Sequence, residues 1–208
     1  GNTLSYDSLA TVALETDSGD YLIGGNVHSG VSDSGDPTIE TEYQDIFLIK
    51  LSEDGELIWQ KAYANSGGFD NLSAICRTDG GYILAGGTGP WGNGYGFVMK
   101  VDEGGEIVWQ KGYTEGISSS LTDLAPLSDG SFAVPGLYQS GGVLIKLRDD
   151  GSLEWARVYS TNRIPSVLES PEGGLIMAVD NLLLKTDSEG SCCLLKGDAQ
   201  IVQMNPQF

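Results

Sequence analysis

The sequence of 208 residues predicts an all-β fold, and three features of its pattern lead to that prediction. Short apolar runs are bounded by Gly and Asp at regular spacing, which is typical of short strands joined by tight turns. The same succession of expected turns and strands occurs four times along the chain. No stretch carries a helical period with caps at its ends.

A Gly-x-x-x-Trp unit marks each repeat, where it follows a tight polar turn and opens the last strand. Three copies are intact, and the fourth is decayed because leucine stands at the tryptophan position: Gly55–Trp59, Gly105–Trp109, Gly151–Trp155 and Gly190–Leu194. A lysine precedes each turn at matching intervals: Lys50, Lys100, Lys146 and Lys185. The interval between copies therefore gives the length of one repeat.

A second unit, Gly-x-aromatic, opens a strand of small residues earlier in each repeat. Its copies begin at Gly19, Gly80 and Gly130, and a weaker copy begins at Gly173. The two units together predict four short strands in each repeat. These are an apolar strand before an Asp-Gly-type turn (Leu121–Leu127 in the third repeat), the small-residue strand, an apolar strand ending in lysine, and the strand with the tryptophan.

Four-stranded units that recur about every 40 to 60 residues indicate the blades of a β-propeller. One such sheet cannot bury both of its faces, so neighbouring blades must cover them. We predict a single domain over residues 1–208, a propeller of about four four-stranded antiparallel blades. The repeats fall at roughly 4–65, 66–115, 116–160 and 161–198, followed by a tail at 199–208. The tryptophans are expected to pack between blades as structural residues: Trp59, Trp109 and Trp155.

The second repeat carries the clearest form of the pattern, Asp-Gly-Gly-Tyr-Ile-Leu-Ala-Gly followed by Phe-Val-Met-Lys-Val-Asp and Ile-Val-Trp-Gln-Lys. This pattern resembles the repeats of secreted bacterial and archaeal β-propeller proteins. Its Gly-x-x-x-Trp end is similar to the tryptophan-docking motif of quinoprotein (PQQ-like) repeats. The resemblance runs from about Tyr6 to Leu195, and it implies a propeller located outside the cytoplasm: extracellular, at the cell surface or periplasmic.

The resemblance leaves ring closure open, because propellers of that group usually have more blades than this chain. Three arrangements follow: four blades that close alone, a segment of a larger ring, or two chains that share one ring. The sequence begins with Gly1 instead of Met and shows no signal peptide, so we interpret Gly1 as a processed or artificial terminus.

The acidic composition limits the classes of partner. Eleven Lys and Arg residues face 29 Asp and Glu residues, for a formal net charge of −18. Such a surface repels the phosphates of nucleic acids and anionic lipid headgroups. No apolar run reaches the length of a membrane-spanning helix. We expect no nucleic-acid partner and no transmembrane segment; the acidity suits solubility, salt adaptation, cations or basic partners.

The three cysteines are Cys76, Cys192 and Cys193, an odd number that gives no disulfide framework. Neighbouring residues on a strand point to opposite faces, so a bond between the adjacent pair would need unusual backbone. Cys76 is expected to be a small apolar residue of the core, and a bond from it to one of the pair stays open. His28 is the only histidine, which excludes a zinc site built on several histidines.

The connections between the second and third strands carry most of the variation between repeats. Their side of the propeller is therefore the candidate functional face. The longest connection spans residues 26–45 and holds Asp33 and Asp36. Two carboxylates in one loop are a candidate calcium site, and the alternative is an ordinary solvated loop.

Aromatic residues supply a second candidate site on the same face. Trp91 and Tyr95 lie in the second repeat's connection, and Tyr43 ends the first one. Exposed aromatic rings beside glycines can stack on a sugar ring or clamp a peptide. The alternative for Trp91 is a lid that folds back over its own blade.

The sequence shows no catalytic constellation: no Ser-His-Asp set, no phosphate loop and no distinctive pair of carboxylates. We predict a non-catalytic structural or protein-binding module of a cell-surface or larger assembly. It would bind protein partners through the face that carries the long loops of repeats one and two, with no cofactor except optional calcium. The alternative is a small carbohydrate-binding, lectin-like propeller that binds a glycan with the help of calcium. A third possibility is a glycosidase or lyase.

Overall fold

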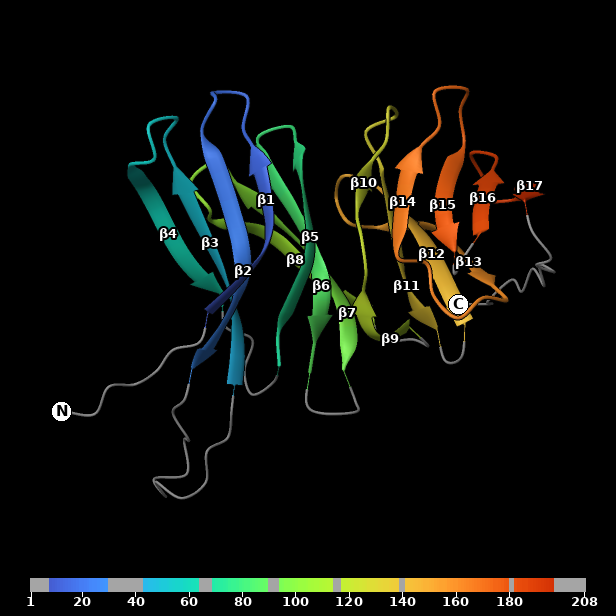
Figure 1. The fold of residues 1–208 in the computed structure, drawn as a ribbon, viewed down its shortest axis with the longest axis horizontal. Helices are drawn as coiled ribbons and strands as arrows, with labels where there is room; N and C mark the ends of the chain where they lie inside the picture. The colour runs from blue at the N-terminus through green and yellow to red at the C-terminus, as the bar shows by residue number, and fades with distance from the viewer. Residues whose placement is uncertain are drawn as a thin grey trace, which may run out of the picture.

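The computed structural model describes residues 8–29, 43–63, 69–89, 94–113, 117–138, 141–179 and 182–196. Over these residues the chain forms 17 β-strands and no helix. The strands make four antiparallel sheets that follow one another along the chain (Figure 1). The predicted all-β propeller architecture is confirmed, with one sheet for each predicted blade.

Each of the first two sheets has four strands in sequential order from one edge to the other. The first sheet consists of β1 (Ser8–Glu15), β2 (Tyr21–Ser29), β3 (Tyr43–Leu51) and β4 (Leu57–Tyr63). The second sheet consists of β5 (Asn71–Thr78), β6 (Gly81–Thr88), β7 (Tyr95–Asp102) and β8 (Ile107–Tyr113).

The third and fourth sheets repeat this order with one modification, since two short strands share the first place in the third sheet. The third sheet consists of β9 (Ile117–Leu121), β10 (Ala125–Pro126), β11 (Phe132–Tyr138), β12 (Gly141–Leu147) and β13 (Leu153–Tyr159). The fourth consists of β14 (Ser166–Glu169), β15 (Leu175–Val179), β16 (Leu182–Thr186) and β17 (Cys192–Lys196).

The split between β9 and β10 corrects the single strand expected over Leu121–Leu127. Both short strands pair with β11, and between them the Thr122 N–H still donates to the Pro135 carbonyl of β11 at 2.9 Å. The side chains between the two strands also bond toward the fourth sheet. Thr122 Oγ1 donates to the carbonyl of Ile164 at 2.6 Å. Asp123 accepts the backbone N–H of Val167 at 2.9 Å. The segment between β9 and β10 therefore links the third sheet to the fourth.

Tight turns of one form join the third and fourth strands of each sheet. In the turn after β3, Gly55 N–H donates to the Ser52 carbonyl at 2.9 Å, and Ser52 N–H donates to the Glu56 carbonyl at 2.8 Å. The equivalent bonds close the turn after β7. The glycine adopts φ of 84° at Gly55 and 77° at Gly105, a left-handed conformation that other residues adopt only with strain.

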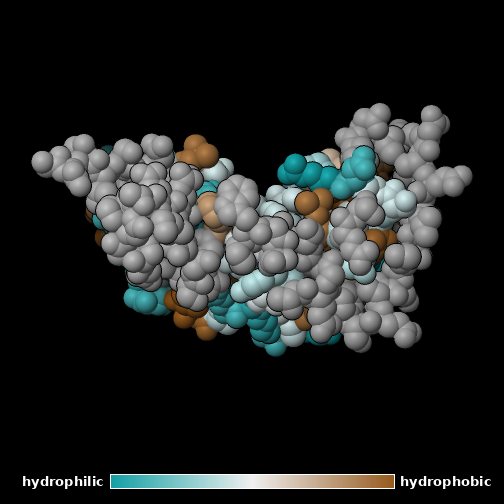
Figure 2. Space-filling model, turned by 90° about the horizontal axis from the view of Figure 1, so that it is seen from below, coloured by the Kyte–Doolittle hydropathy of each residue, from teal (hydrophilic) through white to brown (hydrophobic). Residues whose placement is uncertain are grey.

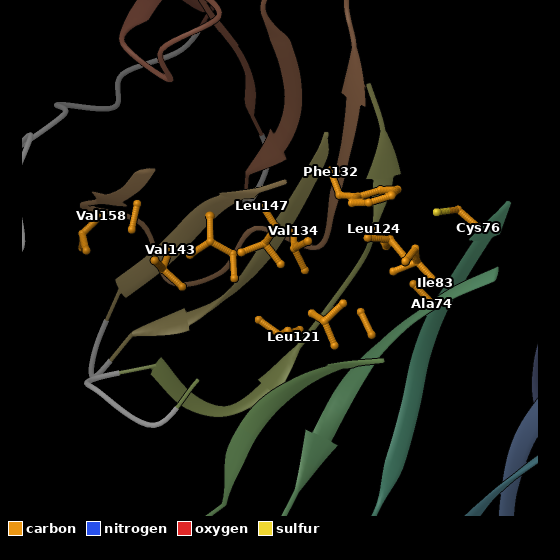
Figure 3. Packing of buried hydrophobic residues seen from close by; sticks show 14 residues of the cluster. Ala74, Cys76, Ile83, Leu121, Leu124, Phe132, Val134, Val143, Leu147 and Val158 are labelled. Atoms are coloured by element: carbon orange, nitrogen blue, oxygen red, sulfur yellow. The ribbon is translucent and has the colours of Figure 1, made fainter. Parts of the chain in front are cut away.

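The hydrophobic core forms three layers, one between each pair of neighbouring sheets. Figure 3 shows the middle layer, where Cys76 and Ile83 of the second sheet face Leu121, Phe132 and Val134 of the third. Packing between described sheets joins consecutive sheets, so the first and fourth lie at opposite ends of the arrangement (Figure 1). Seen along the strands, the molecule is hollowed on one side between its two ends (Figure 2).

Cys76 is a free thiol buried in the middle layer, as a core residue is expected to be. Burial raises the pKa of its thiol to about 12, so the reactive thiolate is scarce at neutral pH. In a Cys192→Ser/Cys193→Ser background, we expect iodoacetamide at pH 8 to modify Cys76 slowly in the folded protein and rapidly in urea. Mass spectrometry of the labelled protein measures both rates. Equal rates in the two conditions would contradict the burial of this side chain.

Candidate functional site

The tryptophan of the first sheet forms part of a joint with the second sheet. Trp59 Nε1 donates to the backbone carbonyl of Glu103 at 3.1 Å. Its ring lies over Gly105, where an added Cβ would come within 3.0 Å of the ring. Four residues further along β4, the Tyr63 hydroxyl donates to the carbonyl of Gly105 at 2.8 Å. A strand with a Trp-x-x-x-Tyr pattern therefore packs on the glycine turn of the next blade and donates hydrogen bonds to it.

The same joint recurs between the second and third sheets. Trp109 Nε1 donates to the carbonyl of Asp149 at 3.1 Å, and the Tyr113 hydroxyl donates to the carbonyl of Gly151 at 3.0 Å. Burial raises the pKa of the Tyr113 hydroxyl well above its usual value, so it remains a donor. The Gly-x-x-x-Trp unit of the sequence thus takes part in two joints. Its glycine is contacted by the tryptophan of the preceding sheet, and its own tryptophan packs on the glycine of the following sheet.

The third joint keeps the tryptophan but loses one hydrogen bond. Trp155 packs over Gly190, and the Tyr159 hydroxyl donates to the Gly190 carbonyl at 2.6 Å. Trp155 Nε1 is buried and finds no hydrogen-bond partner among the described residues. All three joints share the packing of the ring on the glycine and the tyrosine hydrogen bond to the glycine carbonyl, whereas the indole hydrogen bond is present in the first two.

In the first two sheets, the lysine before the turn also contributes to these joints by forming an ion pair with the following sheet. Lys50 Nζ lies 3.3 Å from Glu103, and Lys100 Nζ lies 2.8 Å from Asp149 in the following sheet. Burial disfavours the charge of Lys50, but hydrogen bonding with Tyr82 and Glu103 outweighs it and raises its pKa. The Lys50 ammonium is therefore a charged part of the first joint.

The third sheet uses its lysine internally. Lys146 Nζ lies 2.7 Å from Asp129 and 3.2 Å from Glu154. Burial acts to raise the pKa of Asp129, but hydrogen bonds from Lys146 and Ser131 outweigh it and lower that pKa to about 2. Asp129 therefore stays ionised well below neutral pH.

Acid titration of Asp129 should be visible in stability. Its pKa is lower in the folded chain than in the unfolded chain, so its contribution is present above about pH 4 and is lost as the pH falls toward about 2. The carboxylate is half-exposed, so the contribution is about 1 kcal/mol or less. We expect urea unfolding of wild type and Asp129→Asn to differ at neutral pH and to converge near pH 2. A difference that persists at pH 2 would contradict this assignment.

Asp129 also lines a cleft of about 630 Å³ on the turn side, between the second and third sheets. Arg77 and Arg148 border the same cleft. Arg77 pairs with Asp17 and donates to the Glu15 carbonyl, and Arg148 donates to the Leu153 carbonyl at 3.3 Å. Asp129 and the two arginines of the cleft are therefore engaged in structural contacts. The sequence did not predict this cleft, since the turns that form it look uniform.

Most of the loop-face residues expected from the sequence lie outside the described residues: Trp91, Asp33 and Asp36. Tyr43 and Tyr95 begin β3 and β7, which are equivalent places in neighbouring sheets. The side chain of Tyr43 is outside the description. Tyr95 packs on its own sheet, where a Cβ added to Gly112 would lie 2.6 Å from the ring. The proposed sugar-stacking and calcium roles of these residues stay predictions.

A buried polar cluster supports the loop side of the first two sheets. Asn26 Oδ1 accepts the backbone N–H of Leu72 at 2.9 Å, and Thr88 Oγ1 donates to the carboxylate of Asp70. The backbone N–H of Asp70 donates to the Gln44 carbonyl at 2.7 Å. Asn26, Asp70 and Thr88 are all buried. The sequence signal for this cluster is the presence of polar residues at the ends of otherwise apolar strands. The cluster was not among the site residues predicted from the sequence.

The first sheet leaves one apolar face uncovered. Tyr21 is 42 % exposed, whereas its equivalents Tyr82 and Phe132 are 0 % and 2 % exposed. The strand registers make these residues equivalent, since each lies opposite the last apolar residue of the third strand. The uncovered face, defined here as Tyr21, Ile23, Phe47, Ile49 and Leu51, contains only exposed or half-buried side chains. A groove of about 380 Å³ runs along it beside β4.

The described residues contain no group of three or more His, Cys, Asp and Glu side chains placed to hold a metal ion. A search of the same residues finds no helix with the length and apolar character needed to span a membrane. The described site is thus a set of joints between blades and one uncovered apolar face.

These observations define the chain as a β-propeller module. No protein-family model and no curated protein matches the sequence. Solved structures resemble it in fold. The structure of the Dos1 propeller matches with a TM-score of 0.62 and 13 % identity over 93 % of this chain and 59 % of that one. A protein of unknown function from Bacteroides caccae matches with a TM-score of 0.53 and 10 % identity over 85 % of this chain and 59 % of that one.

At such low identity the likeness shows the fold alone. The chain spans about three-fifths of the length of both solved structures. The propeller architecture therefore rests on the four sheets, their joints and the likeness to the Dos1 propeller.

Proposed function

We propose that the chain is a non-catalytic structural or protein-binding module of a larger assembly. The observation that carries the proposal is the uncovered face of the first sheet. Residue by residue it matches faces that neighbouring blades bury in the second and third sheets. Apolar area of this kind gains roughly 25 cal/mol for each Å² removed from water, so a protein partner is its expected cover.

The use of the charged groups supports a non-catalytic role. Among the described residues, the ammonium groups of Lys50, Lys61 and Lys100 pair with carboxylates of the following sheet. Perturbed pKa values can mark active sites, but they also arise in structural ion pairs. Here the raised pKa values of Tyr63, Tyr82 and Cys76 follow mainly from burial in the layers between sheets.

The proposal also includes a location outside the cytoplasm and a second contact through the loop face. The repeat pattern resembles secreted propeller proteins with a quinoprotein-like docking motif, which favours a place at the cell surface, in the periplasm or outside the cell. The long connections of repeats one and two would offer a further protein contact. The buried cluster of Asn26, Asp70 and Thr88 lies on the described strands and strand ends next to those connections.

The mass of the protein gently extracted from its own cells tests the proposal. One chain has a mass of 22.0 kDa, and we expect the extracted protein to run as a larger complex. Tyr21→Lys should release the single chain, because it places a charge on the uncovered face. Ile58→Lys is the matched control: its equivalent in the second sheet, Val108, remains 57 % exposed although the first sheet covers that face, so a charge at Ile58 should leave the complex intact.

Two results would contradict the proposal. If the extracted wild-type protein runs as a single chain, the claim that it belongs to an assembly is wrong. Equal disruption by Tyr21→Lys and Ile58→Lys would show that the uncovered face is not the contact. The melting temperatures of both variants verify that each remains folded.

A further inference from the structure

Each joint between blades has two halves. The donor half is a last strand whose tryptophan and basic residue point toward the next sheet, as Trp59 and Lys61 do. The acceptor half is the glycine turn of that next sheet, with its apolar face beside it. Three donor halves meet three acceptor halves within the chain. Among the residues that the structure describes, one acceptor half, on the first sheet, and one donor half, on the fourth sheet, stay unmatched.

The unmatched acceptor half has the same build as a matched one. Gly55 and Gly105 have similar left-handed backbones, with φ of 84° and 77°. A Cβ added at Gly105 would meet the ring of Trp59 at 3.0 Å, whereas one added at Gly55 would meet no atom within 4 Å. The Gly55 turn is therefore shaped like an occupied joint but holds no tryptophan.

The unmatched donor half lies on the opposite end of the arc, on the fourth sheet. Its outward face includes Leu168 and Leu183, each 50 % exposed. In the first sheet Lys50 lies opposite Trp59, and Leu48 lies opposite Lys61. In the fourth sheet Lys185 lies opposite Leu194, and Leu183 lies opposite Lys196. By strand register, Leu194 and Lys196 therefore stand at the positions of Trp59 and Lys61.

The charges of the two unmatched halves are complementary. In the first joint Lys61 pairs with Glu106 of the following turn. The Gly55 turn carries Glu56 at the position of Glu106, directly after its glycine. Lys196 stands at the position of Lys61 on the fourth sheet. A sheet like the fourth, placed before the first, would bring Lys196 to Glu56.

We propose that a second copy of this chain covers the uncovered face. The fourth sheet of each copy docks on the first sheet of the other, so two equivalent joints close one ring of eight blades. This inference rests on the proposed function and names its partner. A head-to-tail contact closes into a ring when the rotation between copies completes a turn.

Sedimentation equilibrium of the purified full chain is the first test. Two chains of 22.0 kDa give 44.0 kDa, and we expect that mass for wild type. Tyr21→Lys should shift the protein toward 22.0 kDa, and Ile58→Lys should not. A purified wild type that stays at 22.0 kDa at every concentration would overturn the inference. If the protein extracted from cells still runs as a complex, the proposed function stands and only the identity of the partner is wrong.

Charge reversal tests the pairing itself. Glu56→Lys alone and Lys196→Glu alone each place like charges in both joints, so each should weaken the dimer by at least about tenfold. When the two variants are mixed, both joints of the mixed dimer regain opposite charges, and 44.0 kDa should return. Asp79→Lys makes the same charge change as Glu56→Lys in an exposed turn of the second sheet, and should leave dimerisation unchanged. No recovery on mixing, or equal weakening by Asp79→Lys, would overturn the proposed geometry.

Discussion

Replacement of Trp155 by alanine is expected to lower the free energy of unfolding by about 3–5 kcal/mol. The side chain is buried in the layer between the third and fourth sheets, where its ring covers Gly190. Its removal leaves a cavity that the surrounding strands cannot close, because the Tyr159 hydroxyl still holds Gly190 at 2.6 Å. Urea denaturation of the two proteins measures the difference.

The phenylalanine variants separate packing from hydrogen bonding. Trp155→Phe should cost clearly less than Trp155→Ala, because the indole N–H has no partner among the described residues. Trp109→Phe forfeits a hydrogen bond to the Asp149 carbonyl, worth about 1 kcal/mol. A cost below about 1 kcal/mol for Trp155→Ala would mean that the third joint is not packed as described.

Replacement of Gly81 by alanine is the second large expected effect, a loss of about 2–5 kcal/mol. The residue has φ of 154°, and a Cβ there would collide with the carbonyl oxygen of Val101 on the paired strand. Left-handed backbone costs about 1–2 kcal/mol for a residue with a side chain. Overpacking against a strand that cannot move costs about 1–3 kcal/mol more.

The neighbouring glycine is the matched control for this variant. Gly80 has φ of 74°, but an added Cβ would meet no atom within 4 Å. Gly80→Ala should therefore cost only the backbone contribution of about 1–2 kcal/mol. Thermal unfolding of the two variants side by side measures the difference. Equal losses would show that the Val101 carbonyl does not limit the Gly81 position.

The fold could be predicted because its rules are local. Period-two strands, glycine turns and the spacing from Trp59 to Trp109 to Trp155 all leave traces in consecutive residues. The break after Leu121 could not be predicted in this way. It depends on bonds from Thr122 to Ile164 and between Asp123 and Val167, residues more than forty positions away in and just before the first strand of the fourth sheet.

The candidate site was less predictable than the fold. The sequence directed attention to long loops and exposed aromatic residues, because variable connections often carry function. The uncovered face has no such signal: Tyr21 and Tyr82 stand in nearly identical sequence contexts. Only the arrangement of the sheets shows that a neighbour covers one and not the other.

Hydroxyl-radical footprinting of Tyr21 in the native assembly tests the central claim most directly. In the purified Glu56→Lys variant, Tyr21 should be oxidised as a partly exposed tyrosine, since it is 42 % exposed in one chain. In the native assembly, we predict that Tyr21 is protected as strongly as Tyr82, which is fully buried. Oxidation of Tyr21 in the native assembly as fast as in the separated chain would contradict the claim that this face is an interface.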